Sequence, residues 1–294
     1  MTATSSTDAT PRHLLLATDF SARCDRALDR AAQLTGEWQA ELVALNVLAP
    51  TAPDQALAWA SGENEEQLLH MARKQLARDL AAMPVPATLR IVHGSDAAAA
   101  IRDTATAIQA DLVVTGVSCS EALGRLLLGS TVENLARSLP QPLLVVHDRA
   151  RQAYRRILVA SDFSESSRHA LLTTARLFPG RELILYHAYA SPLAGLADAP
   201  PSPGDGIVAK ESECAAFLAA SALPAGVKVR PVIEYGPVES TLTRYVREHD
   251  IELVALGSHG GSRIMSLLLG STAAKLLDWL PCDTLLVREP RAKA

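Results

Sequence analysis

Short apolar segments alternate with longer, mixed segments along this chain, and the whole pattern occurs twice. Apolar runs of this length are typical of strands that are buried on both faces of a parallel sheet. In the first half they predict strands at residues 14–17, 41–48, 88–92, 111–115 and 143–146. In the second half they predict strands at residues 157–160, 182–188, 228–234, 251–256 and 284–287.

The segments between these strands predict helices. In addition to a helix after each first strand, helical segments are expected near residues 63–82, 97–109, 132–139, 207–222, 238–249 and 273–280. Strands and helices that alternate along a chain favour a parallel sheet with helices on both faces. We therefore expect an α/β protein with two tandem, open, five-stranded parallel sheets of the Rossmann-like kind, whose ligands bind at the carboxyl ends of the strands.

Two polar segments mark the expected domain boundaries. Residues 1–10 are rich in Ser and Thr and predict a disordered tail, and residues 148–155 predict a charged linker. The expected domains are residues 11–148 and 154–290, and 294 residues suffice for two domains of ordinary size. Since 48% of the residues are hydrophobic but only 4% are aromatic, Leu, Val, Ile and Ala must form both cores.

The strongest chemical signal is a glycine motif that follows the fourth strand of each half. In the second half, Gly257 and Gly260 are followed by nine residues and then by Gly-Ser-Thr at residues 270–272. Glycine lets a backbone approach a ligand closely, and the amides at a helix N-terminus stabilise an anion by roughly 0.3–1 kcal/mol. His259 and Arg263 lie between the glycines and supply a hydrogen-bond donor and a positive charge for a phosphate.

These motifs resemble those of the universal stress protein family, and the resemblance covers nearly the whole chain in two copies. The family's nucleotide motif is Gly, two residues, Gly, nine residues, Gly, and then Ser or Thr, which residues 257–271 match in full. The resemblance implies ATP binding, with Mg²⁺ able to accompany the nucleotide, and the adenine nucleotide alpha hydrolase-like form of the fold. It also implies a cytoplasmic stress-response role and pairing between domains.

The resemblance also implies which residues contact the nucleotide. In the family, an Asp at the end of the first strand contacts adenine, and a residue on the second strand lines the adenine pocket. The predicted second site comprises Ala160, Ser161, Asp162, Ala188, Gly257, His259, Gly260, Arg263, Gly270, Ser271 and Thr272. The predicted, weaker first site comprises Thr18, Asp19, Val47, Gly116, Gly129, Ser130 and Thr131. Asp162 has an alternative interpretation as the cap of the helix after the first strand.

The two glycine motifs differ at three positions. Cys119 replaces the second glycine in the first half, so a side chain projects toward the space that a phosphate needs. Glu121 and Ala122 stand where the second half has Ser262 and Arg263. A carboxylate repels a triphosphate, so we expect the first site to be weak, empty or repurposed and ATP to bind mainly in the second domain. Cys119 has two interpretations: a substitution that arose by drift at a site no longer used, or a redox-sensing thiol.

Composition and charge exclude several classes of protein. The net charge of −4 does not suit a nucleic-acid binder, and no apolar run approaches the roughly 18 residues that span a membrane. The four cysteines are scattered, which is unlike a disulfide framework or a structural zinc site and fits a reducing cytoplasm.

The motifs show no dedicated general base, so any ATP hydrolysis should be weak. The hypotheses are a regulatory ATP-binding protein, a slow ATPase or phosphoryl or nucleotidyl transferase, and a nucleotide-free interaction module.

The fifth strands predict how the two domains pair. Residues 143–146 and 284–287 are apolar, and the fifth strand is a sheet edge in the family. Because an exposed apolar edge invites aggregation, we expect the two edges to pair antiparallel within one chain, with a homodimer as a further possibility. Hydrogen exchange should then be slow in both strands, and the prediction is wrong if both exchange without protection.

Overall fold

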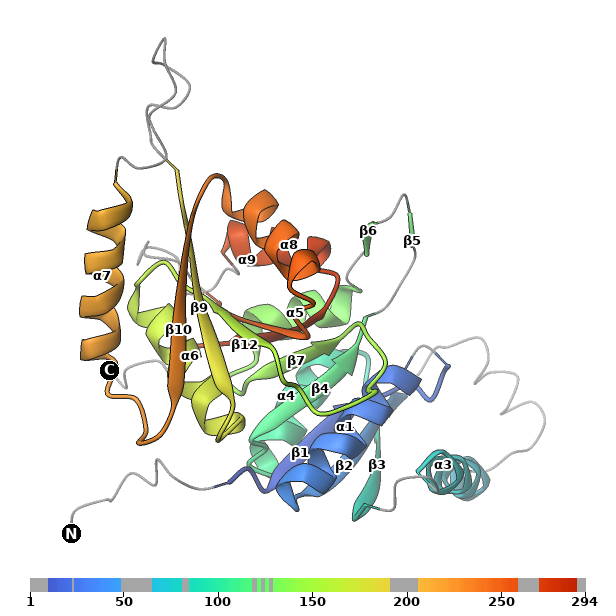
Figure 1. Cartoon of the computed structure of the whole chain (residues 1–294). Helices are drawn as coiled ribbons and strands as arrows, with labels where there is room; N and C mark the ends of the chain where they lie inside the picture. The colour runs from blue at the N-terminus through green and yellow to red at the C-terminus, as the bar shows by residue number, and fades with distance from the viewer. Residues whose placement is uncertain are drawn as a thin grey trace, which may run out of the picture. The chain divides into compact units, whose positions relative to one another are not determined.

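The structure is a computed structural model that describes residues 10–22, 24–48, 65–80, 85–117, 121–122, 125–126, 129–190, 206–258 and 270–289. The contacts divide the chain into two compact units, one of residues 11–153 and one that starts at Tyr154 (Figure 1). Each unit has its own set of parallel strands and its own helices. The predicted helix boundaries at residues 63 and 82 lie outside the described residues.

The first unit has a sheet with the strand order β7-β4-β1-β2-β3, and all of its pairings are parallel. The strands are β1 (His13–Ala17), β2 (Glu41–Leu48), β3 (Ala87–His93), β4 (Leu112–Gly116) and β7 (Leu143–Val146). The helices are α1 (Asp25–Trp38), α3 (Glu65–Asp79), α4 (Ala97–Ala107) and α5 (Ser130–Ser138). A short antiparallel pair, β5 (Glu121–Ala122) with β6 (Arg125–Leu126), follows β4 and was not expected from the sequence.

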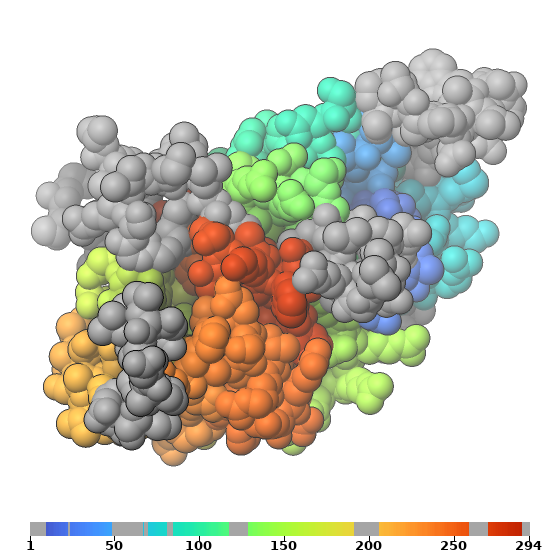
Figure 2. All heavy atoms as spheres, turned by 90° about the horizontal axis from the view of Figure 1, so that it is seen from above, coloured from blue at the N-terminus to red at the C-terminus, as the bar shows by residue number. Residues whose placement is uncertain are grey.

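The second unit repeats this order as β10-β9-β8-β11-β12, again with parallel pairings. Its strands are β8 (Ile157–Ala160), β9 (Glu182–Tyr189), β10 (Lys228–Tyr235), β11 (Leu253–Gly257) and β12 (Asp283–Val287). Its helices are α6 (Glu165–Leu177), α7 (Ile207–Ala220), α8 (Val238–Glu248) and α9 (Ser271–Trp279). Helices α6 and α7 cover one face of this sheet and α8 and α9 the other (Figure 1), and α8 lies beside α9 at the surface (Figure 2). The predicted α/β fold with parallel sheets is therefore confirmed.

Buried apolar strands form the core of each sheet. Leu14, Leu15 and Leu16 of β1 are fully buried, as are Ile157, Leu158 and Val159 of β8. These central strands have helices on both faces, which explains why their sequences are continuous apolar runs and do not alternate.

The fourth strands begin later than the sequence predicted, and an acidic side chain explains the difference in both units. The carboxylate of Asp111 accepts hydrogen bonds from the backbone amides of residues 12 and 13, at 2.8 and 3.2 Å. Glu252 accepts in the same way from the amides of residues 155 and 156, at 2.6 and 3.0 Å. The acid before each fourth strand therefore satisfies amides at the start of the first strand, and the ladder begins after it.

Candidate functional site

The predicted second site lies where the strand order of the second unit reverses. β8 pairs with β9 on one side and with β11 on the other, so the carboxyl ends of these three strands meet at one edge of the sheet. The chain leaves β9 toward β10 and leaves β11 toward β12, in opposite directions from β8. Such a switch point is where open α/β sheets bind ligands. Ala160, Ala188 and Gly257 all lie at or near these strand ends.

The turn after β8 presents Asp162 at this edge. The Ser161 amide donates to the Tyr186 carbonyl at 2.9 Å, which extends the pairing of β8 and β9 by one residue. Asp162 is exposed, and its carboxylate accepts a hydrogen bond from the Ser164 amide at 3.1 Å. Phe163 adopts a left-handed backbone conformation, with φ of 62°, which turns the chain sharply toward α6.

The alternative interpretation of Asp162 as a helix cap is wrong. Ser164 is the residue directly before α6, its backbone is extended, and its hydroxyl accepts from the Ser167 amide at 3.3 Å. Asp162 closes the turn two residues earlier, so its side chain stabilises the turn and leaves the cap to Ser164. The exposed carboxylate is thus held at the strand edge.

His187 is a residue of this edge that the sequence analysis did not single out as a site residue. Its Nδ1 lies 2.8 Å from the Ser161 carbonyl oxygen, and its ring stacks on Phe163 with centroids 4.2 Å apart. Burial lowers the pKa of His187 below its ordinary value, although the bond to Ser161 opposes this shift. The available signal was a polar residue inside an apolar strand, next to the predicted site residue Ala188.

The glycine motif of the second unit is described at both of its ends. The Ser258 amide donates to the Val287 carbonyl at 2.9 Å, and the Gly270 amide donates to the Ser258 carbonyl at 3.0 Å. Gly270 directly precedes α9, and Ser271 and Thr272 are exposed in its first turn. The end of β11 therefore lies against the N-terminus of α9, as the motif requires. His259, Gly260 and Arg263 lie outside the described residues.

Gly257 is needed for close packing of a strand on a helix. A Cβ at this position would lie 2.7 Å from Ser166 Oγ and 3.0 Å from the Ser166 carbonyl carbon and oxygen. Such distances are shorter than van der Waals contact, and the backbone atoms of α6 cannot move away as a flexible side chain would. The first glycine of the motif thus lets β11 end directly against α6.

We expect Gly257→Ala to lower the free energy of unfolding by about 1–3 kcal/mol, because the added methyl overpacks this contact. Urea unfolding monitored by circular dichroism measures the change. Gly36→Ala is the control, since Gly36 is an exposed residue of α1 whose Cβ would meet only Val85 Cγ1, at 3.9 Å. That change should stabilise by up to about 1 kcal/mol. A Gly257→Ala protein as stable as the wild type would contradict the close approach.

The first unit repeats the turn geometry but uses its aspartate differently. Phe20 is left-handed, with φ of 57°, and Asp19 accepts from the Ser21 amide at 2.8 Å. Asp19 Oδ1 also accepts a hydrogen bond from the Cys24 thiol at 3.1 Å. Burial opposes ionisation, but the bonds from Ser21 and Cys24 lower the pKa of Asp19 below its ordinary value. In the second unit Ser167 stands in place of Cys24 and its hydroxyl bonds Ser161 instead, at 2.9 Å.

The remaining residues of the predicted first site lie at the matching positions. Thr18 directly follows β1, half-buried Val47 lies near the end of β2, and Gly116 ends β4. Gly129 directly precedes α5, and Ser130 and Thr131 form the first helical residues. Cys119 lies outside the described residues, whereas Glu121 and Ala122 form β5. The differing positions thus fall within the insert between β4 and α5.

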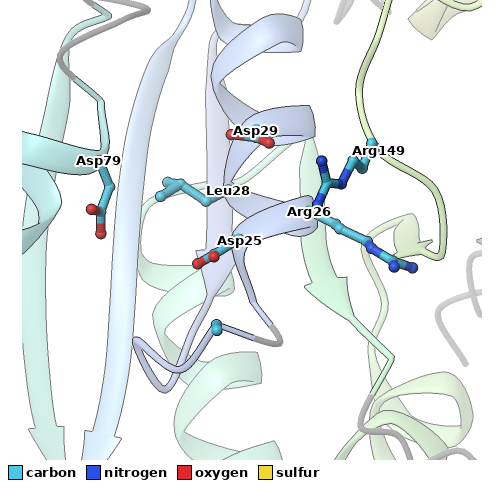
Figure 3. Close-up of a pocket in the computed structure, with 7 residues that line it drawn as sticks. Asp25, Arg26, Leu28, Asp29, Asp79 and Arg149 are labelled. Atoms are coloured by element: carbon cyan, nitrogen blue, oxygen red, sulfur yellow. The ribbon is translucent and has the colours of Figure 1, made fainter.

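A cavity in the first unit lies apart from this predicted site. It has a volume of about 440 Å³ and is lined by Ala22, Asp25, Arg26, Leu28, Asp29, Asp79 and Arg149. Figure 3 shows the α1 residues with Asp79 across from Leu28, and Arg149 near Arg26. Burial raises the pKa of Asp29. The nearby charge of Asp25 raises this pKa further, whereas the charge of Arg149 lowers it. The lining set includes none of the predicted nucleotide residues, so this cavity gives the glycine motif no support.

The described ranges contain neither a metal-binding cluster nor a membrane-spanning helix. Within them, no three His, Cys, Asp or Glu residues converge in a way that would hold a metal ion. No helix in the same part of the chain has the length and hydrophobicity needed to cross a membrane.

Comparison with known proteins gives the same answer for both halves. The model of the universal stress protein family matches residues 10–147 and again residues 153–288. A universal stress protein of Mycolicibacterium smegmatis is 27% identical to this chain over 301 residues, covering 95% of this chain and 98% of its own length.

Two solved structures share the fold over nearly the whole length. A protein of unknown function from Pseudomonas aeruginosa has a TM-score of 0.68 at 19% identity, covering 97% of this chain and 95% of the other. A universal stress protein from Archaeoglobus fulgidus has a TM-score of 0.65 at 20% identity, covering 98% of this chain and 100% of the other. With the family matched twice along its length, this chain belongs to the universal stress protein family as a tandem member.

Proposed function

We propose that this tandem universal stress protein binds ATP, which Mg²⁺ can accompany, mainly in the domain of residues 154–290, and that the bound nucleotide regulates a stress response. The observation that carries the proposal is the hydrogen bond from the Gly270 amide to the Ser258 carbonyl, at 3.0 Å. It holds the N-terminus of α9 at the end of β11, beside the strand whose turn carries Asp162. A phosphate group and an adenine ring can thus be held at one edge of the sheet.

The chemistry of each end fits a nucleotide. At the phosphate end, the exposed hydroxyls of Ser271 and Thr272 lie in the first turn of α9, where the helix dipole favours an anion. The predicted contributions of Gly260 and Arg263 add a close backbone approach and a positive charge. At the base end, the exposed carboxylate of Asp162 accepts hydrogen bonds, which suits an adenine amino group.

The cysteines support a cytoplasmic location. Cys24 and Cys214 are unbridged thiols, and burial raises the pKa of both. Thiols of this kind stay protonated and unreactive, which agrees with a reducing compartment.

Titration calorimetry of the purified chain with ATP and Mg²⁺ tests the proposal, with GTP as the control nucleotide. We expect one main site per chain that prefers ATP. Two equal ATP sites would contradict a degenerate first domain. A chain that neither retains nor binds ATP would be a nucleotide-free interaction module, and steady multiple turnover would identify a slow ATPase or transferase.

A further inference from the structure

The side chain of His187 holds the turn that presents Asp162. Its Nδ1 lies 2.8 Å from the Ser161 carbonyl oxygen, and its ring stacks on Phe163 at 4.2 Å with an interplanar angle of 28°. The two contacts flank Asp162 on both sides in sequence. Because a carbonyl oxygen only accepts, Nδ1 must carry the proton of the neutral ring.

The other ring nitrogen is buried. His187 is only 8% exposed, and no described residue makes a hydrogen bond with its Nε2. Neutral histidine leaves a bare lone pair at Nε2, whereas protonation would place a second N–H there without an acceptor. The neutral ring therefore fits this position and the charged ring does not.

The first unit fills the same position with a residue that cannot titrate. Asn46 is the sixth residue of β2, as His187 is the sixth residue of β9. Its amide Nδ2 donates to the Thr18 carbonyl at 2.9 Å, which is the bond that His187 makes to Ser161. Both second strands thus hold the turn after the first strand from one position, but only the second unit uses a group with an acid form.

We propose that His187 is a positioning residue of the nucleotide site proposed above, and that it holds the Asp162 turn in its binding conformation only while the ring is neutral. Protonation would favour a ring that turns toward water, which would break the bond to Ser161 and the stack on Phe163. ATP binding should therefore weaken in acid through this side chain. The identity of the ligand in this inference rests on the proposed function, whereas the contacts of His187 do not.

The charged groups around His187 act in opposite directions, so burial decides its preference. Lys210 of α7 disfavours a second positive charge, whereas Glu213 of α7 and Asp162 of the turn favour one. Arg168 of α6 lies over the ring of Phe217, which itself packs against Phe163. Burial is the largest influence, and it lowers the pKa of His187, so the ring is neutral at physiological pH.

Two substitutions separate the hydrogen bond from the titration. His187→Asn introduces the residue that the first unit uses, and we expect its affinity for ATP with Mg²⁺ at about pH 7.5 to stay within about threefold of the wild type. His187→Leu fills the same space with an apolar side chain but leaves the Ser161 carbonyl without its donor, and we expect affinity at least about tenfold weaker. Wild-type affinity in His187→Leu would overturn the proposal, even if His187→Asn also binds normally.

The pH dependence of ATP affinity distinguishes a titrating His187 from a purely structural one. Between about pH 7.5 and pH 5, wild-type affinity should fall at least about threefold more than the affinity of His187→Asn, because only the wild type binds a proton here. The same nucleotide serves both proteins, so titration of its own phosphates cancels in the comparison. An equal loss of affinity in the two proteins would overturn the proposal.

A measurement without nucleotide distinguishes this proposal from the proposed function. Nuclear magnetic resonance of the ligand-free protein should show the amide signals of Phe163 and Ser164 shifting with the titration of His187, and staying constant over the same pH range in His187→Asn. Absence of ATP binding by the wild type at about pH 7.5 would contradict the proposed function alone. Amide signals of Phe163 and Ser164 that do not shift with the titration of His187 would contradict the positioning role, whether or not ATP binds.

Discussion

Gly260→Glu is expected to weaken ATP binding at least about a hundredfold, which corresponds to about 2.8 kcal/mol of binding free energy. The substituted carboxylate would enter the phosphate end of the second site, where it fills the space left by glycine and repels the triphosphate. Calorimetric titration measures the loss. The effect should be large because the second domain holds the only complete copy of the glycine motif in the sequence.

Gly129→Glu is the control from the first domain, at the last glycine of its motif. Gly129 directly precedes α5 as Gly270 precedes α9, and its backbone, with φ of −66° and ψ of 150°, is allowed for any residue. The substitution should change ATP affinity less than about twofold if, as proposed, ATP binds mainly in the second domain. Equal losses in the two variants would mean that the sites are equivalent, and unchanged binding in Gly260→Glu would place the nucleotide elsewhere.

Acid is expected to destabilise the first unit through His147, which directly follows β7. The side chain is only 4% exposed, and its backbone carbonyl accepts a hydrogen bond from Arg26 Nη1 at 2.6 Å. Burial lowers the pKa of His147 from 6.5 to about 4, an effect that Asp148 opposes and Arg26 reinforces. Between these two values the unfolded chain binds a proton that the folded chain does not.

The sign and size of the effect follow from this difference. The stability that neutral, buried His147 contributes is complete above pH 6.5 and is lost as the pH falls toward about 4. The loss in the free energy of unfolding is about 3 kcal/mol. Urea unfolding of the wild type and of His147→Gln at several pH values isolates it. His169 and His187, whose pKa values burial also lowers, contribute equally to both proteins. Parallel pH profiles would show that His147 does not titrate as described.

Local pattern predicted the strands and helices well because each is a contiguous run. The predicted strands at residues 41–48 and 143–146 match β2 and β7 residue for residue. The ends of other elements depend on side chains that act across the sheet. Asp111 and Glu252 were assigned to strands, but their carboxylates bind amides almost a hundred residues earlier in the chain, and no local pattern contains that information.

The sequence by itself determined the duplication, the parallel α/β fold, the family and the residues of both candidate nucleotide motifs, because these depend on apolar periodicity and on fixed spacings. Only the tertiary structure decided how individual side chains are used. It assigned the helix cap to Ser164 instead of Asp162, and it bonded the Cys24 thiol to Asp19 in one unit only. It also placed Gly257 against Ser166, and it placed His187 in contact with the turn that carries Asp162. The physical reason is that each contact joins strand ends and helices far apart in the chain, where distance and burial set the energy and residue type alone does not.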